Sequence, residues 1–347
     1  MSGRRLISLD AMGGDKAPGV VVDGAALALE RHPDLRFLIF GDEARVAPLL
    51  ATRPKLSAAV ELRHTADWIA SDAKPSAALR GGRNSSMRLA IDAVRAGEAD
   101  GVVSAGNTGA LMALAKFVLR TLGSIDRPAI ASFFPTQRGE SVMLDLGANV
   151  ECGADNLVQF AVMGEAFART VLGVRQPTIG VLNVGSEEMK GHDEVRAAAA
   201  TLRAGRLAPQ FHGFIEGNDI TEGTTDVVVT DGFTGNVALK TAEGTARLYS
   251  SFLRGAFASS LAAKLGYLLA RHALAKLRER TDPRRYNGAM FLGLNGVVVK
   301  SHGGTDAVGF ANAIGVAADM IANAINARIS QELALLGAPP AGDQAAS

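Results

Sequence analysis

Short runs of β-branched and other apolar residues alternate along this chain with longer stretches that are rich in alanine and leucine. The short runs, predicted as strands, cover residues 6–9, 37–40, 60–63, 101–104, 130–133, 142–146, 178–182, 211–215, 227–230 and 297–300. The predicted helices cover residues 20–31, 85–96, 108–121, 156–172, 193–207, 235–257 and 306–335. Several strands are apolar throughout, as in strands that helices cover on both faces. The strand–helix–strand order therefore predicts the α/β class, with a mostly parallel sheet and helices on both of its faces.

The length of 347 residues allows one large domain or two modest ones. No repeat and no clear linker divides the sequence, so we expect residues 1–336 to form a single α/β unit, built as one body or as two tightly joined lobes. Residues 337–347 are small and polar and include two prolines, and we expect them to form a disordered tail.

Charge, cysteine content and hydropathy exclude several classes of protein. The 36 basic and 35 acidic residues leave a net charge of +1, which is too balanced for a nucleic-acid partner. A single cysteine excludes an internal disulfide framework and a cysteine-rich metal site, and it suits a reducing compartment. No stretch of about 18 residues is apolar and uncharged, and no secretory signal precedes the first strand. We therefore expect a cytoplasmic protein.

The segment 247–285 differs from the rest of the chain in charge and pattern. It holds nine Lys or Arg and two acidic residues, a net charge of +7. Apolar residues recur there at helical spacing between basic ones, which predicts an amphipathic helix or helical pair with possible breaks at Gly255 and Gly266. Such a basic amphipathic insertion could lie on an anionic membrane surface, receive an acidic protein or form a dimer interface.

Polar, glycine-rich loops follow seven of the predicted strands. They read DAMGGDKAP, SAGNTGA, DLGAN, NVGSEEMKGHDE, EGNDI, TDGFTGN and KSHGGTD. Ligands of parallel α/β sheets bind at the carboxyl ends of the strands, and backbone N–H groups at helix N-termini suit an anion. Helix capping and tight turns explain part of the same composition. The candidate phosphate- and substrate-binding residues in these loops are Asp10, Gly13, Gly14, Ser104, Gly106, Asn107, Thr108, Asn183 and Lys300.

Several familiar chemistries lack their motif. The sequence contains no GxxxxGK[ST], no GxGxxG after a strand and no GxSxG, so a P-loop, a Rossmann dinucleotide site and a hydrolase elbow are excluded. We interpret Cys152 as a small buried residue rather than a nucleophile. Asp10 and Asp15 lack a third carboxylate, so we expect no metal. What remains is a site for phosphate and a second group, in which phosphate itself could be the nucleophile.

Six stretches of the sequence resemble the PlsX family, the bacterial phosphate acyltransferases of phospholipid synthesis. They are ISLDAMGGDKAP at 7–18, SAGNTGA at 104–110, MLDLGAN at 143–149, LNVGSEEMKG at 182–191, DVVVTDGFTGNVALK at 226–240 and HGG at 302–304. They cover nearly the whole chain in one order. The resemblance implies a fold like that of the isocitrate/isopropylmalate dehydrogenases and phosphotransacetylases, usually as a homodimer.

The resemblance also implies a reaction: a long-chain acyl group passes from an acyl carrier protein thioester to inorganic phosphate, with no cofactor. The acyl phosphate product would go to a membrane glycerol-phosphate acyltransferase, and the protein would be cytoplasmic with peripheral membrane association. For this reaction we expect Lys190 to neutralise phosphate or the developing oxyanion. Asp231 and Asn236 would orient the site, and His302, or less favourably His192, would protonate the leaving thiolate.

Three alternatives to this function stay open. A phosphotransacetylase-type enzyme would use acyl-coenzyme A, whose phosphopantetheine arm is the same as that of the carrier protein. A nicotinamide-dependent dehydrogenase would need an Asp cluster for a metal, which we do not find in the sequence. A non-catalytic scaffold on the membrane surface would use the segment 247–285 but would have no use for seven polar loops.

Overall fold

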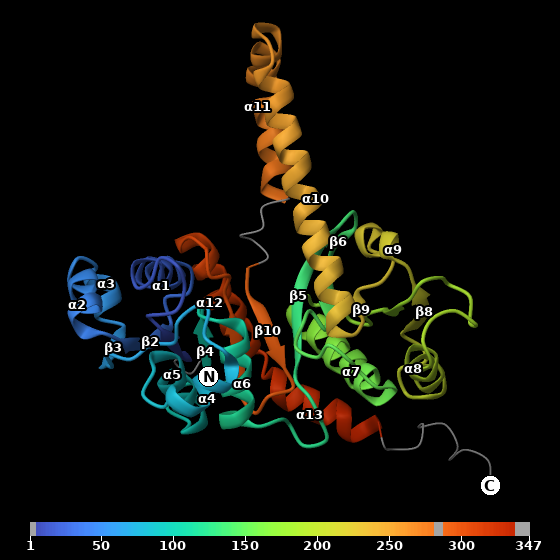
Figure 1. Cartoon of the computed structure of the whole chain (residues 1–347), viewed down its shortest axis with the longest axis horizontal. Helices are drawn as coiled ribbons and strands as arrows, with labels where there is room; N and C mark the ends of the chain where they lie inside the picture. Colours follow the sequence, from blue (N-terminus) through green and yellow to red (C-terminus); the bar gives the residue numbers. More distant parts are fainter. Residues whose placement is uncertain (1–4, 281–286, 337–347) are drawn as a thin grey trace.

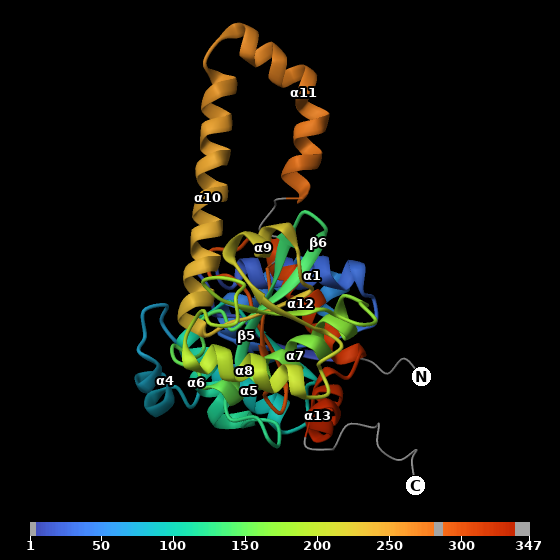
Figure 2. The same ribbon diagram turned by 90° about the vertical axis from the view of Figure 1, so that its right-hand side faces the viewer.

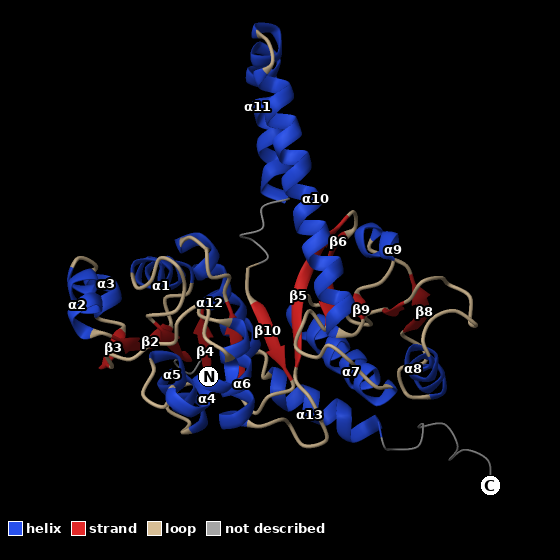
Figure 3. Cartoon of the chain, in the orientation of Figure 1, coloured by secondary structure: helices blue, strands red, loops and turns tan. Residues whose placement is uncertain are grey.

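One eleven-stranded sheet runs through the molecule (Figures 1 and 3), in the order β3-β2-β1-β4-β11-β10-β5-β6-β9-β7-β8. The computed structural model describes residues 5–280 and 287–336, so the predicted tail 337–347 and residues 281–285, the end of the basic segment, lie outside the described residues. The strands are β1 (Arg5–Asp10), β2 (Leu35–Gly41), β3 (Val60–His64), β4 (Gly101–Ser104), β5 (Ala129–Thr136), β6 (Gly139–Leu144), β7 (Ile179–Leu182), β8 (Phe211–Ile215), β9 (Val227–Val229), β10 (Ala289–Leu292) and β11 (Val297–Lys300).

The sheet is parallel except around its middle. Strand β10 runs antiparallel to both β11 and β5, and β5 runs antiparallel to β6. Three successive reversals mean that β6, β7, β8 and β9 run opposite to β1, β4 and β11. The prediction of a mostly parallel sheet is confirmed in its coarse form, but β10 was not predicted. The run Ala-Met-Phe-Leu is too short for its pattern to distinguish a strand from a helical segment. It is a strand because it pairs with β11 and β5.

Helices cover both faces of the sheet, as predicted. Alternate residues of β2 show this directly, because Phe37 and Ile39 join one core cluster, whereas Leu38 and Phe40 join the other. The first cluster includes residues of α1 (Gly19–Arg31), α7 (Ala154–Val171), α8 (Asp193–Ala204), α12 (Ala307–Ala322) and α13 (Ile325–Leu336); the second includes residues of α5 (Ser86–Arg95) and α6 (Thr108–Leu119). Four short helices were not predicted: α2 (Glu43–Ala51), α3 (Pro54–Ser57), α4 (Pro75–Gly81) and α9 (Gly217–Glu222).

The single helix predicted over residues 306–335 is two helices. The chain bends by 54° between α12 and α13, where Ala324 adopts a positive φ of 50°. Among the described residues, no helix is by itself long and apolar enough to cross a membrane. Helices α12 and α13 reach the length and composition of a membrane span only when they are counted together. Helix α12 buries Phe310, Ile314 and Met320 in the core of the protein.

The basic segment lies on a long helical hairpin that projects from the body of the protein (Figures 1 and 2). Its arms are α10 (Gly232–Ala258) and α11 (Leu261–Arg280). The predicted breaks were wrong: Gly255 and Gly266 lie inside helices, and the turn falls at residues 259–260. Near this turn Phe257 meets Tyr267 edge to face, with ring centroids 5.4 Å apart. The apolar residues that stay exposed on the hairpin include Phe252, Leu253, Leu261, Leu265, Leu268 and Leu269.

Candidate active site

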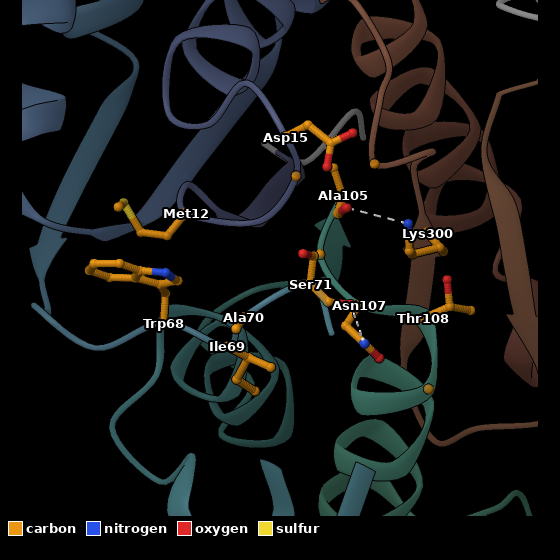
Figure 4. Close-up of a pocket in the computed structure, with 14 residues that line it drawn as sticks. Met12, Asp15, Trp68, Ile69, Ala70, Ser71, Ala105, Asn107, Thr108 and Lys300 are labelled. Carbon is orange, nitrogen blue, oxygen red and sulfur yellow. Dashed lines mark hydrogen bonds between the residues drawn. The ribbon is translucent and has the colours of Figure 1, made fainter. Parts of the chain in front are cut away.

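Three neighbouring strands end together at one edge of the sheet. In the register of β1, β4 and β11, Asp10 and Lys300 both pair with Ser104. The loops that follow these strands, together with the loop after β3, enclose a pocket of about 650 Å³, shown in Figure 4. Of the predicted binding residues, Gly14, Gly106, Asn107, Thr108 and Lys300 line it.

Asp10 is fully buried at the base of this site. Its carboxylate accepts hydrogen bonds from Ser86 Oγ at 2.6 Å, Ser104 Oγ at 2.7 Å and the N–H of Met12 at 3.3 Å. Burial raises the pKa of Asp10, while the two hydroxyl donors and the positive charge of Lys300 act against that rise. The Asp10 carboxylate is therefore already engaged by protein donors at the base of the pocket, and Ser86 is a part of this network that sequence reasoning missed.

Lys300 is the buried cation of the pocket, with 7 % of its surface exposed. Burial lowers its pKa to about 8, although the charges of Asp10 and Asp15 favour the protonated form. Its Nζ donates to the carbonyl oxygens of Ala105, at 3.4 Å, and Ser301. Because this pKa lies above neutral pH, Lys300 carries a positive charge over most of the physiological range.

The N-terminus of α6 supplies the second positive element. Asn107 caps this helix, since its Oδ1 accepts the N–H of Ala110 at 2.8 Å. Its Nδ2 donates to the carbonyl of Ser71 at 2.7 Å, so the Asn107 side chain is already engaged. The first N–H groups of a helix have no intrahelical acceptor, and together with the helix dipole they attract anions. Thr108 and Gly109, in the first turn, line the pocket and are placed for such contacts.

The glycines of DAMGGD are required because the loop after β1 and the loop before α6 approach each other closely. A Cβ on Gly13 would lie 2.5 Å from Asp10 Oδ2 and 2.6 Å from the backbone nitrogen of Gly106. Gly14 adopts a φ of +102°, which L-residues with a side chain rarely reach. The first strand-end loop thus packs directly onto the α6 loop, and only glycine fits between them.

Four predicted site residues lie elsewhere and do not line this pocket. Asp231 caps α10 by accepting the N–H of Thr234 at 2.9 Å and its hydroxyl at 2.7 Å. Asn236 stands beside Gly147. Asn183 Nδ2 donates to the carbonyl of Lys190 at 3.1 Å, and so closes the loop after β7.

The reversed direction of the second strand set explains this separation. A sheet that was parallel throughout would bring all strand-end loops to one edge, but β7 and β9 run opposite to β1 and β4. The structure therefore gathers Asp10, Gly13, Gly14, Ser104, Gly106, Asn107, Thr108 and Lys300 at the ends of β1, β4 and β11, whereas Asn183, Lys190, Asp231 and Asn236 are not among the residues that line the pocket.

The two histidines differ in their relation to the pocket. His302 is exposed next to the lining residue Gly303, and its Nδ1 accepts the N–H of Gly304 at 3.1 Å. A neutral His302 therefore carries its proton on Nε2. His192 occupies the N-cap position of α8, away from the pocket lining.

Asp145 is a second buried carboxylate that sequence reasoning did not single out. It accepts five hydrogen bonds, from the backbone N–H groups of Ile130, Gly147, Ala148 and Asn149 and from the Asn149 side chain. Burial raises its pKa, and the hydrogen bonds from Ala148, Ile130 and Asn149 oppose this rise. The signal was the aspartate that directly follows an apolar strand in MLDLGAN. This carboxylate shapes the loop on which the base of α10 rests.

Cys152 is unsuited to nucleophilic catalysis. Burial raises its pKa to about 11, with the charge of Asp145 acting in the same direction, so the thiol stays protonated. Among residues 5–280 and 287–336, no three His, Cys, Asp or Glu side chains are placed to hold a metal ion.

Solved structures of other proteins identify the fold of this chain. The fold matches a phosphotransacetylase from Streptococcus pyogenes with a TM-score of 0.58 and 18% identity, over 96% of this chain and 95% of that one. A branched-chain phosphotransacylase from Enterococcus faecalis gives a TM-score of 0.57 and 13% identity, over 92% and 99% of the two chains. The protein thus has the fold of the phosphotransacylases. The likeness to the isocitrate dehydrogenase group stays a prediction.

Sequence relatives narrow the class to one family. A family model described as "Fatty acid synthesis protein" matches residues 6–328. The phosphate acyltransferase of Rhodospirillum centenum is 70% identical over 338 residues, which are 97% of this chain and 95% of that protein. The phosphate acyltransferase of Rhodospirillum rubrum is 64% identical over 334 residues, 96% of each. The chain belongs to the PlsX family of phosphate acyltransferases.

Proposed function

We propose that the protein transfers a long-chain fatty acyl group from the thioester of acyl carrier protein to inorganic phosphate. The products are an acyl phosphate, destined for phospholipid synthesis, and the free thiol of the carrier. The observation that carries this proposal is the pocket itself, which opposes the N-terminus of α6 to the buried cation Lys300. Both elements attract an anion of the size and charge of phosphate.

The reaction needs no protein nucleophile. One phosphate oxygen attacks the thioester carbonyl carbon and forms a C–O bond. The C–S bond then breaks, and the carrier thiolate leaves with the electron pair and takes up a proton. A thiol with a pKa of about 8.5 is a good leaving group, so an acid such as His302 assists this step without being essential to it.

The protein lowers the barrier by charge and by position. Negative charge moves onto the carbonyl oxygen in the tetrahedral state, and one well-placed hydrogen-bond donor there contributes about 2.7–4 kcal/mol. Lys300 and the first-turn N–H groups of α6 hold the phosphate, which removes most of the repulsion between two anions. Holding phosphate and thioester together contributes several kcal/mol more.

The residues outside the pocket are assigned to the donor. We assign to Lys190 the neutralisation of developing charge, and to Asp231 and Asn236 the orientation of the loops after β7 and β9. The exposed apolar and basic hairpin supports contact with an anionic membrane surface, and also a homodimer, which sedimentation would test. A membrane glycerol-phosphate acyltransferase is the proposed acceptor of the product.

A product assay tests the function directly. Purified protein is incubated with palmitoyl-acyl carrier protein and inorganic phosphate, and both free carrier thiol and acyl phosphate are followed. We expect both products, each dependent on phosphate. Activity with acyl-coenzyme A alone would identify a phosphotransacetylase-type enzyme. No turnover with either donor, in protein that is folded, would overturn the enzymatic proposal in favour of a membrane scaffold.

A further inference from the structure

The pocket is much larger than one phosphate ion. Its volume of about 650 Å³ lies within the range that encloses a drug-sized ligand. Phosphate has five non-hydrogen atoms and occupies roughly 60–90 Å³, two to three times the share of one water molecule. Most of the pocket is therefore left for a second group beside the phosphate.

The two sides of the pocket differ in chemistry, as Figure 4 shows. Lys300 and Thr108 lie on one side. Met12 and Trp68 lie next to each other on the opposite side. The cationic side suits the phosphate, so the second group takes the side with the indole.

The loop that carries Trp68 is fastened to the anion site at both ends. Before Trp68, the carbonyl of Asp67 accepts the N–H of Ser86 at 2.9 Å, and Ser86 in turn binds Asp10. After Trp68, the carbonyl of Ser71 accepts Asn107 Nδ2 at 2.7 Å. The position of Trp68 is thus fixed by the residues that form the phosphate side of the pocket.

Trp68 is half exposed at the pocket, with 51 % of its surface accessible. Among the described residues, its indole N–H has no hydrogen-bond partner, although this group normally finds one when it is covered. Outside the lining lies Arg45, whose guanidinium carbon is 5.8 Å from the centroid of the Trp68 ring. Arg45 is exposed and makes no ion pair with an acidic residue in the described part of the chain. The outer end of this side therefore combines an aromatic face, a free N–H donor and a cation.

We propose that Trp68 forms the subsite for the pantetheine arm of the thioester donor, an inference that rests on the proposed function. A pantetheine arm has an apolar dimethyl group, two amides and a phosphodiester at its outer end. The indole face matches the apolar group, the indole N–H matches an amide carbonyl, and Arg45 matches the phosphodiester. A long acyl chain would instead need an extended channel without polar groups, whereas Ser71 and Asn107 lie within this pocket. The thioester at the inner end of the arm then reaches the phosphate beside Lys300.

Intrinsic fluorescence tests binding independently of turnover, because Trp68 is the only tryptophan of the chain. The full-length protein is titrated, without phosphate, with carrier protein that bears the arm but no acyl group. The control is the same carrier protein without the arm. We expect a saturable change in Trp68 emission with the first ligand and none with the second. Equal changes with both would overturn the proposal, because the carrier surface rather than the arm would then reach Trp68.

Steady-state kinetics tests the role in the reaction. We expect Trp68→Ala to raise the KM for the thioester donor at least tenfold, with the KM for phosphate within twofold of the parent. Trp68→Phe should restore most of the affinity. Phe117→Ala is the matched control, since Phe117 is an exposed aromatic residue that lines a different pocket, with Arg95 and Arg120. An unchanged donor KM in Trp68→Ala would overturn the proposal.

Donors with two-carbon and sixteen-carbon acyl chains separate the arm from the acyl chain. Trp68→Ala should raise the KM by the same factor for both donors, because both carry the same arm. A rise in KM that is larger for the sixteen-carbon donor would place Trp68 in the acyl channel and refute the arm subsite. If the parent enzyme shows no turnover, the function fails, but the fluorescence titration still decides whether Trp68 binds the arm.

Discussion

Asp10 and Lys300 come from opposite ends of the sequence and stand on either side of Ser104 in one row across β1, β4 and β11. Both are buried, and each shifts the pKa of the other toward its charged form. The buried carboxylate thus helps Lys300 to remain a cation where burial alone would remove its charge. The phosphate side of the pocket depends on this pair.

The first prediction concerns Lys300 and pH. Its pKa of about 8 means that Lys300 is charged below pH 8 and loses its charge as the pH rises through that value. The KM for phosphate should rise above pH 8, roughly tenfold by one unit beyond the pKa. Lys300→Gln should raise the KM roughly ten- to hundredfold at pH 7, since a hydrogen bond to a charged group contributes about 1.5–3 kcal/mol. A KM for phosphate in Lys300→Gln that still rose above pH 8 would assign the titration to another group.

The second prediction concerns the glycine that separates the two loops. Gly13→Ala should abolish most activity and lower the free energy of unfolding by about 1–3 kcal/mol, because its Cβ would overlap Asp10 and Gly106. Gly19→Ala is the matched control, because Gly19 begins α1 with nothing within 4 Å of an added Cβ. Urea unfolding and the product assay measure both effects. Equal stability of the two variants would show that the loop relaxes around the methyl group.

The third prediction concerns the loop beneath α10. Asp145→Asn replaces an acceptor-only group with one oxygen and one NH₂ donor, and the latter faces N–H groups that already donate to Asp145. Leaving buried donors unpaired costs about 1–3 kcal/mol each, so the urea midpoint should fall clearly. Asp100→Asn is the control, since Asp100 is exposed and accepts the N–H of Leu6 at 2.8 Å. Its effect should stay below about 1 kcal/mol.

The fourth prediction tests the catalytic assignment of Lys190. Lys190→Ala should lower turnover at least tenfold, about 1.4 kcal/mol of barrier, while Lys55→Ala, an exposed lysine on α3, should leave it unchanged. Turnover of Lys190→Ala within about threefold of the parent would show that the assignment is wrong. Reaction would then depend on the pocket residues alone.

The fifth prediction separates the uses of the α10–α11 hairpin. Leu268 is 55 % exposed, and Leu268→Glu places a negative charge on a face that would enter an anionic membrane. Burying a leucine side chain contributes about 1.5–3 kcal/mol, so flotation with anionic liposomes should fall at least tenfold. Leu335→Glu, at an exposed leucine of α13, should float like the parent. Lost flotation with unchanged carrier kinetics favours membrane contact; the reverse result assigns the face to the carrier protein.

The sequence by itself determined the fold class and the family, and it singled out two of the loops that meet at the pocket. All ten predicted strands are present, because apolar β-branched runs between glycine-rich turns depend mainly on local pattern. The loops DAMGGD and SAGNTGA were predicted to bind an anion, and the structure brings them together over β1 and β4. These features could be read locally because each depends on turn chemistry and helix capping within a few residues.

The tertiary structure alone decided which loops share a pocket. Strand β10, four residues long, acquires its identity only by pairing with β5 and β11. The reversals around it set the direction of β7 and β9, and the loops after these strands, with Lys190 and Asp231, do not line the pocket. The tertiary structure likewise decided the places of Ser86, which donates to Asp10, and of Trp68, whose loop is held by hydrogen bonds of Asp67 and Ser71 to residues distant in sequence. Sheet order and strand direction arise from the packing of the whole chain, and no short stretch of sequence contains them.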